Sequence, residues 1–184
     1  MLHLTPENAR TMPWKNGGGS TTELLIRPEG LALSERFLFR VSIADVASSG
    51  PFSSFPGVDR HLVVIAGAGM TLTLDGRTVP LELHRPVFFS GDAAAAGTLL
   101  DGPVRDFNLM VDRARAASSL SCVLATAPLA LACASGETVI VHVLSGALDE
   151  AAAGDTLVLD APQVVHPRGE ARLLIGRVVT ANRA

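Results

Sequence analysis

The sequence predicts an all-β protein, and three observations carry this prediction. Apolar and polar residues alternate with a period close to two along most of the chain, as strands with one buried face require. Glycine and proline turn signals recur roughly every 8–12 residues, which is the spacing of short strands in sandwiches and barrels. No window sustains the i, i+3, i+4 apolar stripe of an amphipathic helix.

The individual strands follow from the same pattern. One pair has a clear connection, because Asp75-Gly76 lies between two alternating runs and is a strong signal for a β-hairpin. The alternating or β-rich runs comprise residues 21–26, 37–44, 63–66, 70–74, 77–79, 106–111, 139–144 and 172–179.

A weak internal repeat predicts how these strands are grouped. Residues 63–67 and 143–146 are each an apolar run closed by glycine, and residues 83–89 can be laid over 153–159. The repeat predicts two small barrels in tandem, divided near residues 113–119. We therefore expect an N-terminal barrel over residues 1–115 and a shorter one over residues 116–184.

Composition narrows the class of protein. The chain has 184 residues, of which 48% are hydrophobic and 18% are charged, and its net charge is −3. These values predict a folded globular protein, and the scattered arginines argue against nucleic-acid binding. No apolar run approaches the roughly 20 residues of a membrane-spanning helix, and no signal-peptide pattern is present. We expect a cytoplasmic protein in which Cys122 and Cys133 are reduced, buried thiols.

The stretch WKNGGG at residues 14–19 holds the only tryptophan and the only lysine of the chain. In a phosphate-binding loop the lysine follows the glycines and a helix begins there, whereas here Lys15 comes first and a strand follows. A tight turn explains the glycines but neither Trp14 nor Lys15. A single lysine among arginines favours a role for a slim point charge.

Two predicted strands each carry a polar stripe. Arg40 and Ser42 share one face of the first, and Asp106 and Asn108 share one face of the second. The plain interpretation is a strand with its polar side in water. In a barrel the same face can line the lumen, where Arg40 and Asp106 would pair while Ser42 and Asn108 would orient a ligand.

Other chemistry-bearing residues form no motif. Arg60 ends a turn-rich segment just before an apolar run, and exposure to water is its plain interpretation. The histidines show no His-x-His pair, no carboxylate at metal-ligand spacing and no Ser-His-Asp or Cys-His arrangement. They are His3, His61, His84, His142 and His166.

Several motifs occur together and in a fixed order. They are PWKNGGGSTTEL, FRVSIADVASSGPFSSFPGVDR, VVIAGAGMTLTLDG and DFNLMVDR. With them the chain resembles the HutD/Ves family over most of residues 10–115, and VIVHVLSGAL and GDTLVLDAP are similar to the second half of that family. The resemblance implies a bicupin, two tandem jelly-roll barrels, and an association with bacterial histidine utilisation. It implies no firmly established reaction.

The resemblance also bears on metals. Cupins usually hold a metal ion through His-x-His, a following Glu and a later His. Laying Gly67 on the usual cupin glycine puts Ser54, Pro56 and Arg60 at the first three ligand positions, and no histidine lies near residues 103–108. We therefore expect neither a metal nor another cofactor. Arg60 would instead present a positive fork that suits a carboxylate.

A candidate site follows from these residues. WKNGGG would bring its Trp and Lys to the barrel mouth, two arginines would face an anionic ligand, and the remaining polar groups would balance charge and form hydrogen bonds. Urocanate, formiminoglutamate and formylglutamate fit this chemistry and the pathway association. The predicted ligand-binding residues are Trp14, Lys15, Asn16, Arg40, Ser42, Arg60, Asp106 and Asn108.

Three functions remain open. The first is a metal-free binding protein that senses or regulates through a small anionic metabolite. The second is an isomerase or hydrolase with Asp106 as base and Lys15 or Arg60 as electrophile, although we expect a neighbouring arginine to lower the pKa of Asp106 and weaken it as a base. The third is a protein-interaction module based on the Ser-Phe-Pro segments.

The second half of the chain has fewer candidates. We interpret it as structural support because its polar residues form no convincing cluster. Exposed sheet edges are compatible with a homodimer. The polar residues considered there are His142, Asp149, Asp155 and His166.

Overall fold

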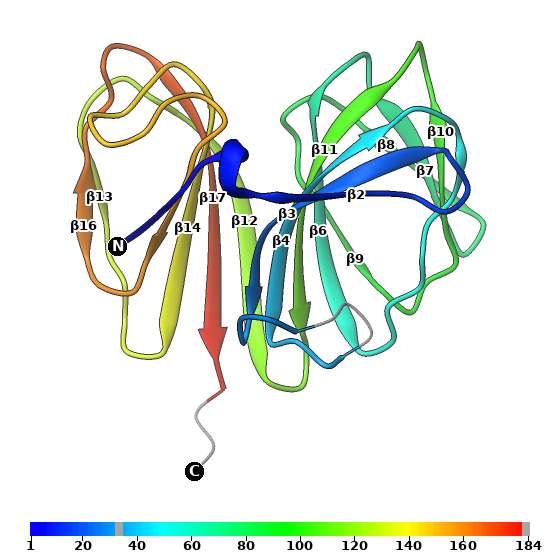
Figure 1. The fold of residues 1–184 in the computed structure, drawn as a ribbon, viewed down its shortest axis with the longest axis horizontal. Coiled ribbons are helices and arrows are strands. Elements are labelled where there is room, and N and C mark those ends of the chain that lie inside the picture. Colours follow the sequence, from blue (N-terminus) through cyan, green and yellow to red (C-terminus); the bar gives the residue numbers. More distant parts are fainter. Residues whose placement is uncertain (32–34, 182–184) are drawn as a thin grey trace. The chain divides into compact units, whose positions relative to one another are not determined.

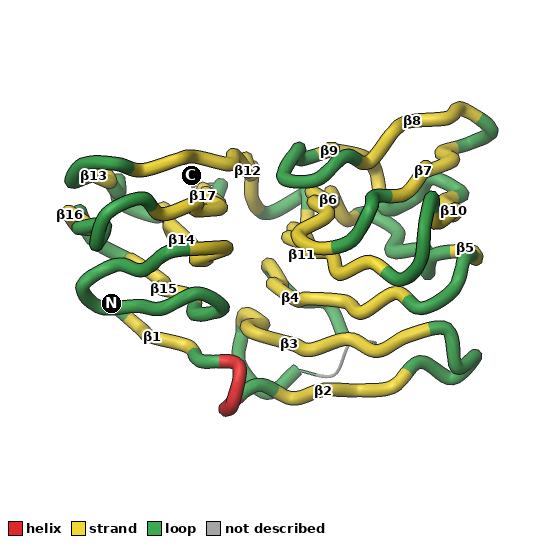
Figure 2. Tube along the Cα trace, turned by 90° about the horizontal axis from the view of Figure 1, so that it is seen from above, coloured by secondary structure: helices red, strands yellow, loops and turns green. Residues whose placement is uncertain are grey.

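The computed structural model describes residues 1–31 and 35–181. Contacts within the chain divide it into two compact units. The large unit comprises Arg10–Ala114, and the small unit comprises Met1–Ala9 together with Arg115–Ala184. Within the described residues both units are built of β-strands, and the one helical element is the short 3-10 turn η1 (Pro6–Asn8) (Figures 1 and 2). The predicted all-β fold class is confirmed.

The large unit consists of two antiparallel sheets, with strand orders β2-β3-β4-β11-β6-β9 and β5-β10-β7-β8. From β4 to β11 the chain passes back and forth between them, in the manner of a jelly roll. Among the described strands each sheet keeps two edges, so neither sheet closes into the predicted barrel. The strands are β2 (Arg10–Pro13), β3 (Gly19–Arg27), β4 (Phe39–Val46), β5 (Gly50–Pro51), β6 (Val58–Ala66), β7 (Met70–Leu74), β8 (Arg77–Leu81), β9 (Val87–Ser90), β10 (Ala95–Leu99) and β11 (Val104–Asp112).

The hairpin predicted at Asp75-Gly76 joins β7 to β8. Leu74 pairs with Arg77 across the turn, and the φ angles of the two central residues are 47° and 80°. Positive φ at both positions is typical of the type I′ turn, whose twist matches that of the flanking strands. The prediction from this dipeptide is confirmed.

The core of the large unit lies between its two sheets. Every second residue of β4, β6 and β11 faces this core, because side chains alternate between the two faces of a strand. The buried core residues are Ala44, Val46, Leu62, Val64, Met70, Leu72, Leu81, Phe89, Ala95 and Val104. A polar side chain on the same face of these strands is therefore inside the unit.

WKNGGG forms the turn between β2 and β3. The amide of Trp14 donates to the carbonyl of Gly19 at 2.9 Å, and the amide of Gly17 donates to the carbonyl of Trp14 at 3.0 Å. Gly17 has a φ of 71°, which favours glycine. A Cβ atom at Gly19 would lie 2.2 Å from the carbonyl oxygen of Asp45, so only glycine fits there. Backbone geometry thus explains these two glycines.

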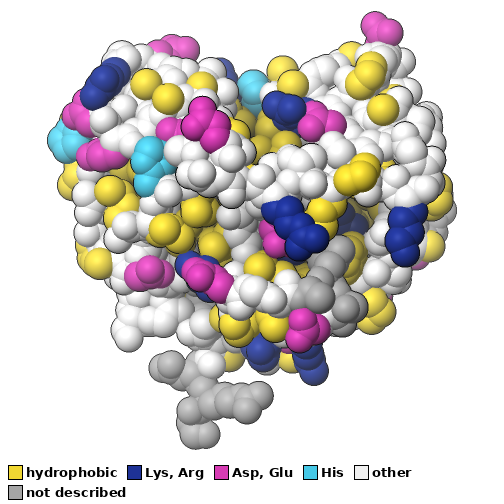
Figure 3. Space-filling model, viewed as in Figure 1, with side chains coloured by type: hydrophobic (Ala, Val, Ile, Leu, Met, Phe, Trp, Pro, Cys, Tyr) yellow, Lys and Arg dark blue, Asp and Glu magenta, His cyan; other side chains and the backbone are white. Residues whose placement is uncertain are grey.

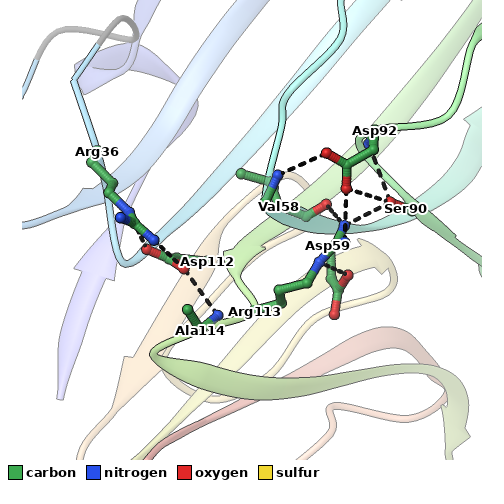
Figure 4. Close-up of polar contacts among 9 residues, drawn as sticks. Arg36, Val58, Asp59, Ser90, Asp92, Asp112, Arg113 and Ala114 are labelled. Atoms are coloured by element: carbon green, nitrogen blue, oxygen red, sulfur yellow. Dashed lines mark hydrogen bonds and ion pairs between the residues drawn. The ribbon is translucent and has the colours of Figure 1, made fainter.

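An ion-pair network around Arg113 fastens the end of β11 to β6 and β9 (Figure 4). The guanidinium pairs with Asp59 at 2.9 Å and with Asp92 at 2.7 Å. It also donates to the hydroxyl of Ser90 at 2.6 Å and to the carbonyl of Val58 at 2.9 Å. These groups are partly exposed, so we assign the network a structural role.

The small unit has a five-stranded sheet, ordered β1-β15-β14-β17-β12, and a two-stranded sheet of β13 and β16. Its hydrophobic core includes Val139, Val141, Leu157 and Leu173. The strands are β1 (Leu2–Leu4), β12 (Ala116–Ala125), β13 (Leu129–Leu131), β14 (Glu137–Ser145), β15 (Thr156–Leu159), β16 (Gln163–Val165) and β17 (Ala171–Thr180).

The start of the chain belongs to the small unit. β1 pairs antiparallel with β15, with His3 opposite Leu157, and the His3 imidazole contacts Asp155 at 2.9 Å. The predicted division placed residues 1–115 together, whereas this pairing transfers residues 1–9 to the other unit. The short run of β1 carries no pattern that would reveal its distant partner.

The surface and the thiols give two further observations. On the face drawn in Figure 3, basic and acidic side chains are intermixed and no single basic area stands out. Cys122 and Cys133 are free thiols, and both are partly exposed rather than buried as we expected. Within the described part of the chain, there is no helix with the length and hydrophobicity that crossing a lipid bilayer requires.

Candidate functional site

Five of the predicted site residues meet on the inner face of the six-stranded sheet. Arg40 and Ser42 come from β4, Arg60 from β6, and Asp106 and Asn108 from β11. Asn108 lies opposite Ser42, and in the next row of the sheet Met110 lies between the two arginines. The exposed fractions of Arg40, Arg60, Asp106 and Asn108 are only 3%, 5%, 3% and 8%. We call these five residues the polar cluster.

Arg40 is held by a carboxylate that the sequence did not single out. Its Nε atom donates to Glu23 Oε2 at 2.7 Å, and its Nη1 atom donates to the Ser42 hydroxyl at 3.3 Å. Glu23 lies opposite Ser42 on the neighbouring strand β3, beside a bulge. The remaining nitrogen, Arg40 Nη2, is buried without a hydrogen-bond partner. The Arg40 charge is thus balanced, but one of its donors is free.

Arg60 lies among three phenylalanine rings. Its guanidinium carbon is 5.8, 5.5 and 5.0 Å from the ring centres of Phe52, Phe55 and Phe89, distances at which cation–π attraction operates. Nη1 contacts the carbonyl of Ser53 at 3.5 Å, and Nε is buried without a partner. Burial lowers the pKa of Arg60 to about 10, while Asp106 raises it and Arg40 lowers it further. Arg60 therefore remains a cation at neutral pH.

Asp106 is buried so completely that its ionisation is affected. Burial raises its pKa to about 7 from an ordinary value of 3.8, although the Arg60 charge acts in the opposite direction and Asp45 adds to the rise. The neighbouring arginine acts in the expected direction, but the expected net lowering of this pKa was wrong. Among the described contacts Asp106 makes no direct ion pair with Arg60. The effect of removal from water on the pKa is therefore larger than the effect of the Arg60 charge. Near neutral pH the protonated and ionised forms of the carboxyl group are therefore both populated.

The third unpaired atom is an acceptor. Asn108 Oδ1 is buried and has no hydrogen-bond partner. Together with Arg40 Nη2 and Arg60 Nε it leaves two cationic donors and one neutral acceptor unsatisfied on the same face of the sheet. Buried polar atoms are nearly always paired, so unpaired ones indicate a water molecule or a ligand. The polar cluster is thus chemically suited to bind a small polar molecule.

The three predicted residues of WKNGGG lie elsewhere on the unit. Trp14 is half-buried against the inter-sheet core, and its Nε1 atom donates to the Thr21 hydroxyl at 2.8 Å. Asn16 is exposed and its Oδ1 atom accepts from the amide of Gly18 at 3.0 Å, which stabilises the turn. Lys15 is exposed as well. The structure therefore does not bring Lys15 or Asn16 into the polar cluster.

The aromatic residues around Arg60 were also missed. Phe52 and Phe55 belong to the segment that sequence reasoning considered for partner docking, and both are half-buried against the guanidinium. The two phenylalanines in GPFSSFPG can be recognised as neighbours of Arg60 only when the position of β6 relative to that segment is known. Glu23 was missed for a similar reason, because its partner is set by the register of β3 and β4.

The residues present do not suit a metal ion. Of the three positions that correspond to cupin ligands, Ser54 and Pro56 are exposed, and the Ser54 hydroxyl donates to the carbonyl of Gly91 at 3.3 Å. The third, Arg60, places a cation inside the unit. Among residues 1–31 and 35–181 there is no group of three His, Cys, Asp or Glu side chains that could hold a metal. The donor set therefore favours an anion over a cation.

Two surface cavities lie apart from the polar cluster. One of about 310 Å³ lies at the ends of β4, β6 and β11 and is lined by Asp45, Gly67 and Arg105 among others. Another of about 590 Å³ lies in the small unit, beside Glu150 and His166. No polar-cluster side chain lines either one. Glu150 Oε2 in the larger cavity is also buried without a partner, but it stands alone, whereas three such atoms gather in the polar cluster.

In the small unit the candidate polar residues have separate partners. His142 is buried, and its Nδ1 atom forms a hydrogen bond of 2.9 Å with the Thr156 hydroxyl. Burial lowers the pKa of His142 to about 4. Asp149 pairs with Arg168 at 3.1 Å on the surface. His166 is exposed. These residues do not form a cluster comparable to that of the large unit.

Comparison with known proteins supplies the family. The model of the family described as HutD matches residues 6–177. An uncharacterized 21.2 kDa protein in the hutC 3' region of Pseudomonas putida is 44% identical over 108 residues, which is 58% of this chain and 56% of that protein. Protein Ves of Cronobacter sakazakii is 37% identical over 136 residues, 73% of this chain and 71% of that protein. The chain thus spans about half the length of the first relative.

Solved structures agree with this assignment. A conserved protein of unknown function from Pseudomonas aeruginosa PAO1 has 32% identity and a TM-score of 0.87 over 97% of this chain and 98% of its own. HutD from Pseudomonas fluorescens SBW25, in a formate condition, has 32% identity and a TM-score of 0.84 over 98% and 99%. A cupin 2 conserved barrel domain protein from Leptotrichia buccalis, at 11% identity and a TM-score of 0.59 over 94% and 96%, shows the fold alone. Because the family model covers nearly the whole chain, this protein belongs to the HutD family and has a cupin fold.

Proposed function

We propose that the protein binds a small anionic metabolite in the polar cluster, without a metal ion, and acts as a sensor or regulator in histidine utilisation. The observation that carries this proposal is the pair of buried, unpaired guanidinium nitrogens, Arg40 Nη2 and Arg60 Nε. Both belong to cations that are removed from water, and such groups are costly to bury unless a partner satisfies them.

The charge balance of the site leaves one positive charge for a ligand carboxylate to neutralise. Arg40 is neutralised by Glu23, and Arg60 has no carboxylate within ion-pair distance among the described residues. Asp106 is largely protonated below a pH of about 7 and then leaves the Arg60 charge uncompensated. A carboxylate ligand would neutralise it and accept the free donors. Each charge-assisted hydrogen bond contributes roughly 1.5–3 kcal/mol, which supports affinities on the order of micromolar.

The candidate ligands come from the family context. The resemblance to HutD/Ves proteins implies an association with histidine utilisation, and urocanate, formiminoglutamate and formylglutamate are compact anions of that pathway. The related HutD structure from P. fluorescens SBW25 is described in a formate condition, and formate is the simplest carboxylate. Access to Arg60 would require the segment with Phe52 and Phe55 to move, since both rings lie against the guanidinium.

Calorimetric titration with the three metabolites tests the proposal. We expect at least one to bind with a dissociation constant on the order of micromolar, and Arg60→Met to weaken it roughly 10- to 100-fold. Arg105→Met is the matched control, because Arg105 lies on β11 of the same unit but is exposed and paired with Asp45. Absence of heat with all three ligands would exclude this ligand class.

One observation favours a second function. A carboxyl group with a pKa of about 7 is well placed for general acid–base catalysis at neutral pH, and Asp106 has this property. The electrophile in an isomerase or hydrolase would then be Arg60, since Lys15 is exposed on the turn. If the wild-type protein forms product in a single turnover and Asp106→Asn does not, catalysis would be favoured over ligand binding as the function.

A protein-interaction module remains the third proposal. Its proposed docking segment contains Phe52 and Phe55, whose rings already contact Arg60 within the unit. Copurification from native cells discriminates it, because an interaction module should retain a partner without added metabolite.

A further inference from the structure

We infer that the ligand carries an N–H donor in addition to its carboxylate, and that Asn108 Oδ1 selects for this donor. This inference rests on the proposed function, since it adds a second recognition element to the same site. It concerns what kind of carboxylate the polar cluster prefers.

In this structure the residues opposite Asn108 on the two neighbouring strands do not hydrogen-bond its amide oxygen. On one side lies Ser42, whose hydroxyl accepts from Arg40 and makes no hydrogen bond to Asn108 Oδ1. On the other side lies Leu62, which has no donor. The side chain is 8% exposed, so bulk water does not compensate for the missing bond. A donor supplied by a molecule that enters the site, a ligand or water, would satisfy this oxygen.

The arrangement of the rows indicates the shape of that molecule. Arg40 and Arg60 lie in the row of Met110, and Asn108 lies in the next row, two residues away on β11. Two residues along a strand span about 7 Å, but the Arg40 guanidinium reaches back to the hydroxyl of Ser42, which lies opposite Asn108, so one compact ligand can contact both rows. One end accepts hydrogen bonds from guanidinium groups, and the other donates to an amide oxygen.

This polarity discriminates among small anions. A bare carboxylate such as acetate would satisfy the arginines and leave Asn108 Oδ1 unpaired. A ligand of the same shape with an ether oxygen in place of N–H would set two acceptors against each other. Sites built to hydrogen-bond a polar group reject analogues that lack it much more strongly than apolar pockets reject a change in size.

Matched ligand pairs test the inference on the full chain. In the first pair, urocanate is compared with 3-(furan-3-yl)acrylate, which keeps the shape and carboxylate but has no N–H. In the second, N-formylglutamate is compared with 2-(formyloxy)glutarate, in which an ester oxygen replaces the amide N–H. For the pair whose first member binds, we expect calorimetry to give at least about tenfold weaker binding of the second member.

Variants of Asn108 test whether this residue causes the preference for the ligand with N–H. In Asn108→Leu the affinity for the ligand with N–H should decrease to that for its isostere, so that the difference in affinity within the pair disappears. Asn108→Asp retains an acceptor oxygen, and should keep the preference within the pair while weakening both anions. If Asn108→Leu does not fold, Asn108→Ala takes its place, because it also removes the acceptor oxygen and should abolish the difference within the pair.

The outcomes separate this inference from the proposed function. Equal binding of both members by the wild-type protein would overturn the N–H requirement, and would mean that ordered water fills the space beside Asn108, while carboxylate binding itself would stand. A preference that persists unchanged in Asn108→Leu would overturn the role of Asn108. If no probe binds, the proposed function fails and the inference fails with it.

Discussion

Arg60 and Asp106 lie on the same inner face of adjacent strands, β6 and β11, and each charge favours ionisation of the other. Burial nevertheless dominates both groups. It lowers the pKa of the guanidinium to about 10 and raises the pKa of the carboxyl group to about 7. At neutral pH the arginine therefore keeps its charge while the aspartate is near its midpoint. This difference makes the charge of the site depend on pH in the physiological range.

The first prediction concerns stability. Because the pKa of Asp106 rises from 3.8 to about 7 on folding, its contribution to stability is fully present below pH 4 and is lost as pH increases through about 7. Asp106→Asn removes this titration. We expect the stability of the variant relative to wild type to rise between pH 4 and pH 8, as measured by urea unfolding. Parallel stability curves for the two proteins would contradict the raised pKa.

The second prediction concerns ligand affinity. Above a pH of about 7 Asp106 is ionised and repels a carboxylate in the same site. We expect the affinity for an anionic ligand to fall as pH rises from 6 to 8, and to be much less dependent on pH in Asp106→Asn. Calorimetry at several pH values in buffers of different ionisation enthalpy would also reveal proton uptake on binding. Binding of the wild type that does not change over this range would exclude Asp106 as a neighbour of the ligand.

Sequence patterns predicted the strands and the polar stripes but not the contacts between them. The alternation in β4 and β11 placed Arg40 with Ser42 and Asp106 with Asn108, and the structure confirms that each pair shares a face. Whether that face met water or the interior depended on the second sheet. Glu23 and the phenylalanines around Arg60 reach the cluster through strand register and loop path, which no local pattern encodes.

The same distinction explains the errors. The pKa of Asp106 was expected to fall because an arginine could be anticipated from the stripes, whereas the depth of burial could not. Lys15 attracted attention as the only lysine, yet the turn that contains it is defined by its glycines. Residues 1–9 were placed in the first unit because pairing between distant strands leaves no mark in so short a segment.

A third prediction concerns Glu23, which neutralises Arg40 at 2.7 Å. Glu23→Gln keeps an acceptor for the guanidinium but removes the negative charge. We expect anion affinity to increase several-fold, because Arg40 then contributes an uncompensated charge. Stability should fall by about 1–3 kcal/mol, since a buried arginine loses its counter-ion.

The control for this prediction is Glu29→Gln, which removes an exposed carboxylate paired with Arg27 outside the site. It should change neither ligand affinity nor stability appreciably, because exposed ion pairs contribute at most about 1 kcal/mol. If Glu23→Gln weakened anion binding, Glu23 would be a direct ligand contact rather than a counter-ion.

A fourth prediction compares two glycines of the WKNGGG turn. A Cβ atom at Gly19 would overlap the carbonyl oxygen of Asp45, a backbone atom of β4 that cannot move without breaking the pairing of β3 and β4. Gly19→Ala should therefore destabilise the protein by about 3 kcal/mol. Gly17 has open space around it and a φ of 71°, so Gly17→Ala should cost only about 1 kcal/mol through backbone strain. Urea unfolding of both variants measures the difference. Equal losses would mean that the turn, and not the close approach of β3 to β4, sets the requirement for glycine.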